Sequence, residues 1–344
     1  MSTTVSFPGL GIGEFSVDRV AFHIFDKPVY WYGVIIMLGI VAAFIHAVIR
    51  SKREGITTDD MLDMGIFTVL FGVLGARLYY VLTTLKTHEY KNLIDVIAVW
   101  EGGLAIYGGI IAGCTALVLT AVYKKINPLK VMDAVGPGVM LAQAIGRWGN
   151  FMNGEAFGYE VAEGSLLYPF RMGLISDYTE GLTMRYYHPT FLYESLWNIL
   201  GFVLISLVYR KKKFNGQMAL MYFTWYGFGR MFIEGLRTDS LYVGPFRISQ
   251  VVGAVCFLAG AILLTVGFIL SHKGKLNTWL QVRWAKALPA EGETVAEPDD
   301  AVAETQPVFA EEADGEASSD SIGEEEPLRP IDGNGPAADT DTQE

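Results

Sequence analysis

The sequence predicts an all-α integral membrane protein with seven transmembrane helices, a small extracytoplasmic head domain and a disordered acidic C-terminal tail. Hydrophobic residues make up 51% of the chain. They gather in runs close to the roughly 20 residues that a helix needs to cross a bilayer. Lysine and arginine concentrate in alternate connections between these runs, as in multi-pass proteins. The runs cover residues 29–49, 61–85, 103–123, 131–148, 190–209, 217–236 and 246–270.

The positive charges indicate the orientation. They lie at residues 50–53, 124–130, 210–213 and 273–286, after the first, third, fifth and seventh runs. Because short positively charged loops stay in the cytoplasm, we expect these four segments on that side. The N-terminus is then outside, and the C-terminal tail is cytoplasmic.

Charge also divides the chain near residue 287. The net charge is −11, yet residues 287–344 hold eighteen acidic residues and a single basic one, Arg329. This segment lacks apolar periodicity and is rich in Pro, Gly, Ser and Thr, so we expect a disordered tail. An acidic docking arm is the alternative. The predicted parts are an N-terminal interfacial segment at 1–28, a seven-span body at 29–286 and the tail at 287–344.

A longer insertion, at about residues 151–189, separates the fourth and fifth runs and contains no span. We expect it to form the extracytoplasmic head, with short strands at about 168–172 and 183–187. Residues 1–28 lack the basic region, apolar core and small-residue cleavage site of a secretory signal, so we expect no cleavage. Their scattered Phe and Ile residues predict a segment that lies along the membrane surface.

Both cysteines, Cys114 and Cys256, lie inside apolar runs. Neither has a neighbouring histidine or other base in the sequence that would favour a thiolate. We therefore expect two buried small hydrophobes rather than a disulfide, a metal site or a catalytic thiol. We expect no metal and no cofactor.

The stretch from Gly146 to Gly158 puts a guanidinium, amides and a carboxylate among glycines at the end of an apolar run. A charged residue inside a spanning segment costs about 2.5 to 3.5 kcal/mol, so it should face a cavity, a partner or a ligand. Positions along the runs place the other unusual polar residues at the same outer leaflet. These residues are Tyr32, Arg77, Glu101, Tyr107, Arg147, Asn150, His188, Glu194, Arg230, Glu234 and Arg237.

This convergence predicts a site that faces the outer leaflet and binds an anion. Arg230, Glu234 and Arg237 share one helical face and could simply neutralise one another. Further arginines remain, however, and the planar fork of arginine suits phosphate. The opposite half of each run is expected to be apolar. Close helix packing explains most of the glycines, whereas Gly149 and Gly154 flank the cluster and are expected to let backbone approach a ligand.

Six segments carry a resemblance to a known family. The first is Gly146-Arg-Trp-Gly-Asn-Phe-Met-Asn-Gly-Glu-Ala-Phe-Gly158. The others are Tyr30-Trp31-Tyr32-Gly33, Gly75-Ala76-Arg77, Glu101-Gly102-Gly103, His188-Pro189-Thr190 with Tyr193-Glu194, and Gly229-Arg230 with Glu234 and Arg237. In this order they resemble the prolipoprotein diacylglyceryl transferases of bacterial cytoplasmic membranes, over about residues 20–275.

The resemblance implies an enzyme that moves the sn-1,2-diacylglyceryl group of phosphatidylglycerol to the lipobox cysteine of a prolipoprotein signal peptide. A thioether forms and glycerol 1-phosphate leaves, which is the first step of bacterial lipoprotein maturation. The implied setting is the inner membrane, among membrane lipid and without nucleic acid. The implied catalytic residues are Arg147, Arg230, Tyr107 and Glu155. The implied substrate-binding residues are Tyr32, Arg77, Gly149, Asn150, Asn153, Gly154, His188, Glu194, Glu234 and Arg237.

Tyr107 departs from the family pattern, because some members carry a histidine there that has been offered as the general base. A protonated phenol is a poor proton acceptor. Either Tyr107 orients the phosphate or thiol by hydrogen bonding, or Glu155 or another group takes the proton. We favour the orienting role and leave the base open. The acidic tail is a second departure, because it extends beyond the part of the chain that resembles the family.

A secondary transporter of an organic anion is the competing class. Such a protein should show internal repeats and polar residues at mid-membrane that serve both faces. The sequence shows no clear repeat. The transferase is therefore the favoured hypothesis.

Overall fold

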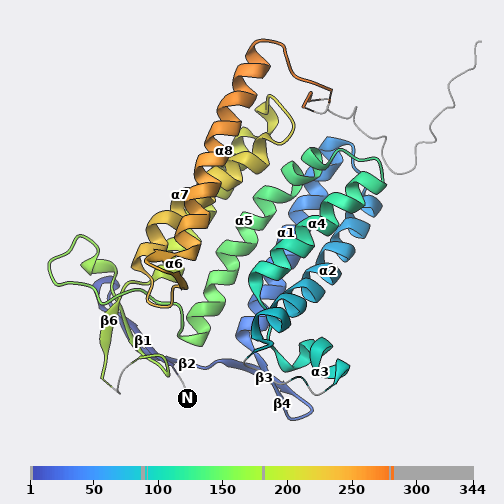
Figure 1. Ribbon diagram of the computed structural model, residues 1–344. Helices are drawn as coiled ribbons and strands as arrows, with labels where there is room; N and C mark the ends of the chain where they lie inside the picture. Colours follow the sequence, from blue (N-terminus) through green and yellow to red (C-terminus); the bar gives the residue numbers. More distant parts are fainter. Residues whose placement is uncertain (1–2, 87–89, 91, 180–182, 279, 283–344) are drawn as a thin grey trace, which may run out of the picture. The chain divides into compact units, whose positions relative to one another are not determined.

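The computed structural model describes residues 3–86, 90, 92–179, 183–278 and 280–282 (Figure 1). The chain divides into two units, residues 1–291 and 292–344, and the predicted acidic tail lies outside the described residues. The described part is mostly helical. Its long helices are α1 (Trp31–Glu54), α2 (Thr58–Thr84), α4 (Ile106–Tyr123), α5 (Pro128–Asn153), α6 (Thr190–Val208), α7 (Gln217–Leu236) and α8 (Ile248–His272).

Each of the seven predicted apolar runs coincides with one of these long helices. Among the described residues, five helices are long and apolar enough to cross a membrane: α1, α2, α4, α6 and α8. The other two also carry ionised side chains of the predicted site, with Arg147 on α5 and Arg230 and Glu234 on α7. The structure thus supports a membrane protein with several apolar helices, and the spans of α5 and α7 remain predictions.

A four-stranded antiparallel sheet joins the N-terminus to the segment that precedes α6. Its order is β2-β1-β5-β6, with β1 (Thr3–Phe7), β2 (Ile12–Val17), β5 (Met172–Ile175) and β6 (Arg185–Tyr187). The predicted strand at 168–172 is wrong, because residues 168–170 form a 3-10 helix and the strand begins at Met172. Pro169 lies in that turn, where its fixed φ and missing N–H disfavour a ladder. The strand predicted at 183–187 overlaps β6.

Two hairpins and several short turns complete the described elements (Figure 1). The first hairpin turns at Phe25 and Asp26, which both have positive φ, and leads directly into α1. The hairpins are β3 (Val20–Ile24) with β4 (Lys27–Tyr30) and β7 (Tyr242–Val243) with β8 (Phe246–Arg247). The short turns are α3 (Leu93–Ile97) and the 3-10 helices Pro8–Leu10, Val99–Glu101, Tyr168–Phe170 and Tyr209–Lys211.

The sheet is fixed to the helices by an apolar core. Phe157, which follows α5, and Phe191, at the start of α6, pack with inward-facing side chains of β1, β5 and β6. This core also fixes the ends of α5 and α6 that carry the predicted site. Its buried members are Val5, Phe7, Val17, Phe157, Met172, Leu174, Tyr187 and Phe191.

Glycines bring α2 and α4 into close contact, as the sequence predicted. A Cβ on Gly75 would lie 2.2 Å from the Ala112 Cβ, and one on Gly108 would lie 2.3 Å from the Gly75 carbonyl oxygen.

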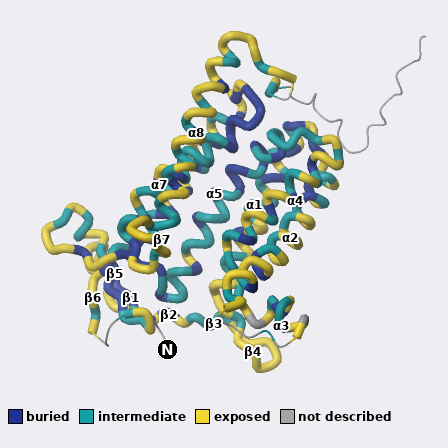
Figure 2. The backbone as a smooth tube through the Cα atoms, in the orientation of Figure 1, coloured by how far each residue is buried: buried dark blue, intermediate teal, exposed yellow. Residues whose placement is uncertain are grey.

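Many outward-facing apolar side chains of the helices are exposed, which fits a surface that meets lipid (Figure 2). Cys114 on α4 is among the exposed residues and Cys256 is only half-buried, so the predicted burial of the cysteines is wrong. An apolar side chain that faces lipid needs no protein cover.

A buried charged cluster lies near the N-terminal end of α5, and it contradicts the expected apolar half of the runs. Lys212 Nζ lies 2.5 Å from Glu54 Oε1 and 3.0 Å from Asp133 Oδ2. The Tyr209 hydroxyl donates to the same Glu54 oxygen at 2.9 Å. Asp133 also accepts the backbone N–H groups of residues 216, 218 and 219, which begin α7. We call Glu54, Asp133, Tyr209 and Lys212 the closed cluster.

Candidate active site

Glu194, in the first turns of α6, is the centre of a second charged cluster, and its side chain is only 4% exposed. Arg147 of α5 forms an ion pair through Nε with one Glu194 oxygen. Arg230 Nη1 of α7 lies 2.5 Å from the other oxygen, and Arg237 Nη1 lies 3.6 Å from it. The structure therefore joins three predicted arginines through one carboxylate.

Glu234 adds a second carboxylate on α7. Its Oε2 lies 2.6 Å from Arg230 Nη2 and 3.9 Å from Arg237 Nε, so the three side chains lie together as predicted, although Arg237 follows the last residue of α7. Arg237 also donates to both oxygens of Asp239, at 3.0 and 2.7 Å. Asp239 is not among the site residues predicted from the sequence. Its only signal was a carboxylate two residues after a predicted site arginine. We call Arg147, Glu194, Arg230, Glu234 and Arg237 the open cluster.

The C-terminal end of α5 carries a chain of polar contacts. Arg147 Nη1 donates to Asn150 Oδ1 at 3.2 Å. Asn150 and Asn153 each donate an amide hydrogen to Glu155 Oε1, both at 3.1 Å. In the described part of the chain, Glu155 forms no ion pair with an arginine or lysine. It differs in this respect from Glu194, Glu234 and Asp239.

Backbone geometry aims Glu155 out of the helix. Gly154 ends α5 in the left-handed region at φ 64°, where glycine is the favoured residue. Ala156 also has a positive φ of 57°, and its carbonyl oxygen accepts the buried Thr190 hydroxyl at 2.6 Å. A non-glycine residue in this region is strained, and such strain concentrates at functional sites. Glu155 is thus held between two left-handed residues.

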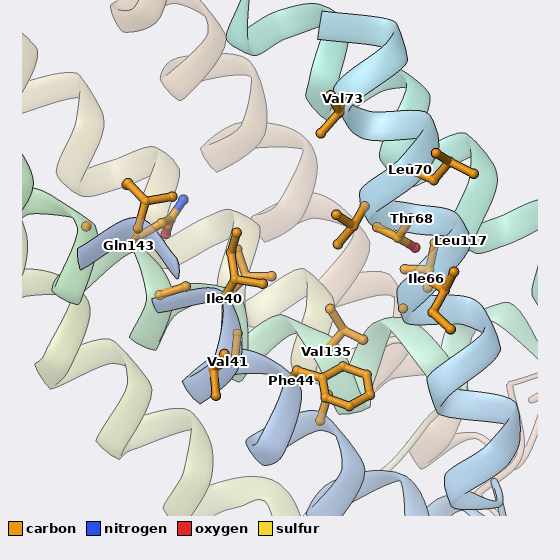
Figure 3. A pocket seen from close by; sticks show the side chains of 18 of the residues that line it. Ile40, Val41, Phe44, Ile66, Thr68, Leu70, Val73, Leu117, Val135 and Gln143 are labelled. Carbon is orange, nitrogen blue, oxygen red and sulfur yellow. The ribbon is translucent and has the colours of Figure 1, made fainter. Parts of the chain in front are cut away.

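A large apolar cavity of about 1110 Å³ has Arg147 among its lining residues. Figure 3 shows side chains of α1 and α2, among them Phe44 and Leu70, around the same space as Val135 and Gln143 of α5. Several lining residues are half exposed, so the cavity is a groove that opens at the surface of the helices. Its polar lining is Tyr32, Thr68, Gln143, Arg147, Asn150 and Tyr226.

A second, polar pocket of about 570 Å³ lies beyond the same end of α5. Asn150 lines both this pocket and the apolar groove. The apolar groove and the polar pocket therefore lie next to each other, on either side of Asn150. The pocket is lined by Asn150, Glu155, Ala156, Phe157, Tyr178, Arg237, Thr238 and Asp239.

Arg77 is engaged away from these groups. Its buried guanidinium donates to backbone carbonyl oxygens of Asp95 at 2.5 Å, Val96 at 2.9 Å, Gly102 at 2.6 Å and Gly103 at 3.3 Å. The first two carbonyls belong to α3, and the other two lie in the connection between α3 and α4. Arg77 therefore joins α2 to the segment before α4, and its substrate-binding role remains a prediction. The Glu101 side chain lies outside the described residues.

Tyr107 and His188 also have partners outside the open cluster. The Tyr107 hydroxyl lies 3.4 Å from the Ser249 hydroxyl, at the start of α8. His188 Nδ1 lies 3.4 Å from the Tyr193 hydroxyl, and burial lowers the pKa of the histidine. The His188 carbonyl oxygen accepts the Gly158 N–H at 2.9 Å, which ties the segment after α5 to the start of α6.

The two flanking glycines are explained by packing. A Cβ on Gly149 would lie 2.9 Å from the Tyr32 ring, so the glycine lets α1 and α5 approach. A Cβ on Gly154 would lie 2.7 Å from Thr3 and 3.0 Å from Ser176, which belong to the sheet region. These contacts account for both glycines without a bound ligand. Tyr32 itself is half-exposed and lines the apolar groove.

Apolar helices and a large apolar groove that has Arg147 in its lining define the class of a membrane protein with a charged site beside an apolar cavity. Comparison with known proteins agrees. Residues 19–266 match the sequence model of the prolipoprotein diacylglyceryl transferase family. The chain belongs to this family, and it is a transferase.

Relatives from several bacteria are named phosphatidylglycerol–prolipoprotein diacylglyceryl transferase. The Listeria innocua protein is 40% identical over 272 residues, which cover 78% of this chain and 94% of the relative. The Streptococcus uberis protein is 41% identical over 252 residues, with 72% and 94% covered. The Streptococcus suis protein is 42% identical over 256 residues, with 73% and 92% covered.

Proposed function

We propose that the protein transfers the sn-1,2-diacylglyceryl group of phosphatidylglycerol to the lipobox cysteine of a prolipoprotein. The observation that carries the proposal is Arg147, which both belongs to the open cluster and lines the apolar groove. Acyl chains are accommodated by the groove, and the phosphate lies at its polar end. Arginine is suited to that phosphate because its fork binds two oxygens.

The chemistry needs negative charge to be stabilised on the leaving phosphate. The cysteine sulfur forms a bond to the carbon of the diacylglyceryl group that carries the phosphate. The bond between that carbon and the phosphate oxygen breaks at the same time. The phosphate keeps the electron pair and leaves as glycerol 1-phosphate. Arg147 and Arg230 exchange part of their contact with Glu194 for the phosphate oxygens, and preorganised donors of this kind lower the barrier most.

Glu155 takes the thiol proton in this mechanism. Its carboxylate receives two amide hydrogens but no ion pair within the described residues, whereas Glu194 and Glu234 are bound by arginines. Asn150 links Glu155 to Arg147, so base and phosphate site are adjacent. Tyr107 orients a reactant by hydrogen bonding. Among the other predicted residues, Tyr32 lines the groove, Arg237 lines the polar pocket and Asn153 holds Glu155 by a hydrogen bond.

The membrane arrangement that goes with this function has seven spans, including α5 and α7. The ion pairs of the open cluster offset the cost of placing charge on these two helices. The protein lies in the bacterial inner membrane with the N-terminus and the active site outside and the tail in the cytoplasm. Cysteine labelling tests this topology: Glu160→Cys should react with an impermeant reagent on intact spheroplasts, and Lys125→Cys should react only after permeabilisation.

We propose that the acidic tail is not needed for the transfer reaction. Residues 290–344 lie beyond the family match, which ends at residue 266. Deleting them should leave transfer intact. Loss of transfer at normal membrane levels would give the tail a function beyond solvation.

Mass spectrometry of a lipobox peptide incubated with purified protein and phosphatidylglycerol tests the reaction. The expected result is a diacylglyceryl mass gain on cysteine with release of glycerol 1-phosphate. Arg147→Ala should abolish the gain, whereas Arg185→Ala is the matched control. Arg185 pairs with Glu160, and both side chains are about half exposed. No product from folded wild-type protein would reject the proposed function.

A further inference from the structure

The polar pocket has walls fixed by backbone pairing. The segment after α5 and the segment after α7 are joined by an antiparallel bridge between Gly158 and Arg237. The Thr238 hydroxyl donates to the Phe157 carbonyl oxygen at 3.0 Å, and the Tyr159 N–H donates to the Leu236 carbonyl oxygen at 2.8 Å. Such pairing preserves the pocket shape, because the Tyr159 bond joins main chain to main chain and the Thr238 hydroxyl bond adds a side-chain contact to the same two segments.

The charges in the pocket do not suit a second phosphate. Glu155 and Asp239 contribute two carboxylates, and Arg237 contributes one guanidinium. That guanidinium is already bound by both oxygens of Asp239 and lies near Glu194 and Glu234. The pocket therefore offers carboxylate and hydroxyl oxygens, which accept hydrogens from peptide N–H groups and attract positive charge.

The pocket also meets the reaction site from the polar side. Asn150 separates it from the groove that takes the lipid, and Glu155 faces it as a lining residue. Asp239 and Tyr178 are about half exposed, so the far side of the pocket is open to water. A polypeptide that follows a membrane-embedded cysteine requires such a path, because its polar backbone has no partners in lipid.

We propose that this polar pocket binds the acceptor polypeptide just after its cysteine, while the apolar groove holds the lipid donor. The inference rests on the proposed function. The cysteine then arrives at Asn150 and Glu155, between the two spaces. A volume of about 570 Å³ is within the range of pockets that enclose small ligands, and it accommodates a short extended segment.

The net negative lining has a consequence for substrate choice. Basic residues directly after the acceptor cysteine should favour binding, and acidic residues there should oppose it. The groups are partly exposed, so each charge should change the specificity only modestly, by about three- to fivefold. A positive charge added at the rim of the pocket should therefore weaken the preference for basic over acidic residues after the cysteine.

The test uses full-length protein with phosphatidylglycerol and lipobox peptides that carry two Lys, two Gln or two Glu residues directly after the cysteine. The ratio of kcat/KM for the Lys and Glu peptides is the readout. Tyr178→Lys adds a positive charge at the pocket rim, where the side chain is 57% exposed. Tyr123→Lys makes the same exchange at the C-terminal end of α4, at a residue that is 86% exposed.

Wild type and Tyr123→Lys should prefer the Lys peptide, and Tyr178→Lys should lose or reverse the preference. Asp239→Asn, which removes one pocket carboxylate, should narrow the same ratio and serves if Tyr178→Lys does not fold. Equal ratios in all folded variants would overturn the inference. So would tighter inhibition of Tyr178→Lys by glycerol 1-phosphate with unchanged peptide ratios, because the pocket would then receive the product. A wild type that modifies no peptide rejects the proposed function itself.

Discussion

Two charged clusters lie at opposite ends of α5, and they differ in how far their side chains are exposed. In the closed cluster the side chains of Lys212, Glu54 and Asp133 are 0%, 1% and 0% exposed. In the open cluster Arg147 is 21% exposed and Arg230 is 13% exposed. A groove and a polar pocket adjoin the open cluster through Arg147, Asn150 and Arg237.

The closed cluster connects chain segments. Glu54 ends α1, Asp133 lies in the second turn of α5 and Lys212 lies between α6 and α7. Asp133 also binds the first N–H groups of α7, which have no partners within that helix. The polar atoms of the closed cluster therefore fix the ends of helices. The open cluster also connects three helices, but its arginines can exchange a carboxylate for a ligand.

The comparison teaches that buried charge alone is a poor sign of function in this protein. Both clusters contain ion pairs shorter than 3 Å between separate segments of the chain. The open cluster differs because Arg147 lines the apolar groove and Arg237 lines the polar pocket. Function is therefore assigned by access, and four predictions test the assignment.

Lys212→Met should have the largest effect on stability and little effect on catalysis. It leaves two buried carboxylates without their cation, and breaking a buried pair costs about 3–5 kcal/mol. We expect a marked fall in the unfolding temperature and in membrane levels. Transfer activity per folded molecule should stay within about twofold, since the site is at the other end of α5.

Lys124→Met is the matched control for that substitution. Lys124 pairs with Asp60 and Asp63, but its side chain is 24% exposed and salt bridges of this kind contribute little. Its unfolding temperature should stay near that of wild type. If Lys212→Met instead unfolds normally and loses activity, the closed cluster takes part in catalysis and the comparison fails.

Arg147→Ala should give the opposite pattern, with a normal unfolding temperature and a loss of activity of about 10²–10³-fold. The loss should appear in kcat, because the lost interaction grows as charge develops on the phosphate. Arg147→Lys should also be severely impaired, since a point charge replaces the planar fork. Near-normal turnover of the lysine variant would contradict two-oxygen binding.

The sequence predicted the parts of the fold that depend on local composition. Apolar run lengths located the seven long helices, and depth along each run placed Arg147, Glu194 and Arg230 at one level. Depth does not determine which way a side chain points around its helix. The shared role of Glu194 and the separate partners of Arg77 therefore required the structure.

The pairing of strands that are far apart in the sequence also could not be predicted. Nothing in Thr4 or Val5 indicates that they pair with Ile175 and Leu174, about 170 residues away. The closed cluster was missed for a similar reason, because Lys212 looked like one charge of a basic loop. Its burial depends on Glu54 and Asp133, which come from two other segments.

Tyr107→Phe should have a smaller effect and decides between the roles considered for this residue. The hydroxyl has one long contact, 3.4 Å to Ser249, and a neutral hydrogen bond contributes about 0.5–1.5 kcal/mol. We therefore expect at most about a tenfold fall in kcat/KM, whereas Glu155→Gln should fall much further. A loss with Tyr107→Phe as large as that with Glu155→Gln would transfer the role of base to Tyr107.

His188 should give the smallest effect, which is visible only as a pH dependence of stability. Burial lowers its pKa, so the folded protein binds the proton less readily than the unfolded chain, whose histidine titrates near about 6.5. Its contribution to stability is present above that pH and is lost as pH falls through the lower folded pKa. Between about pH 7.5 and about pH 5, His188→Gln should lose less unfolding temperature than wild type. An identical pH dependence of the unfolding temperature in both proteins would mean that the protonation of His188 does not contribute to stability.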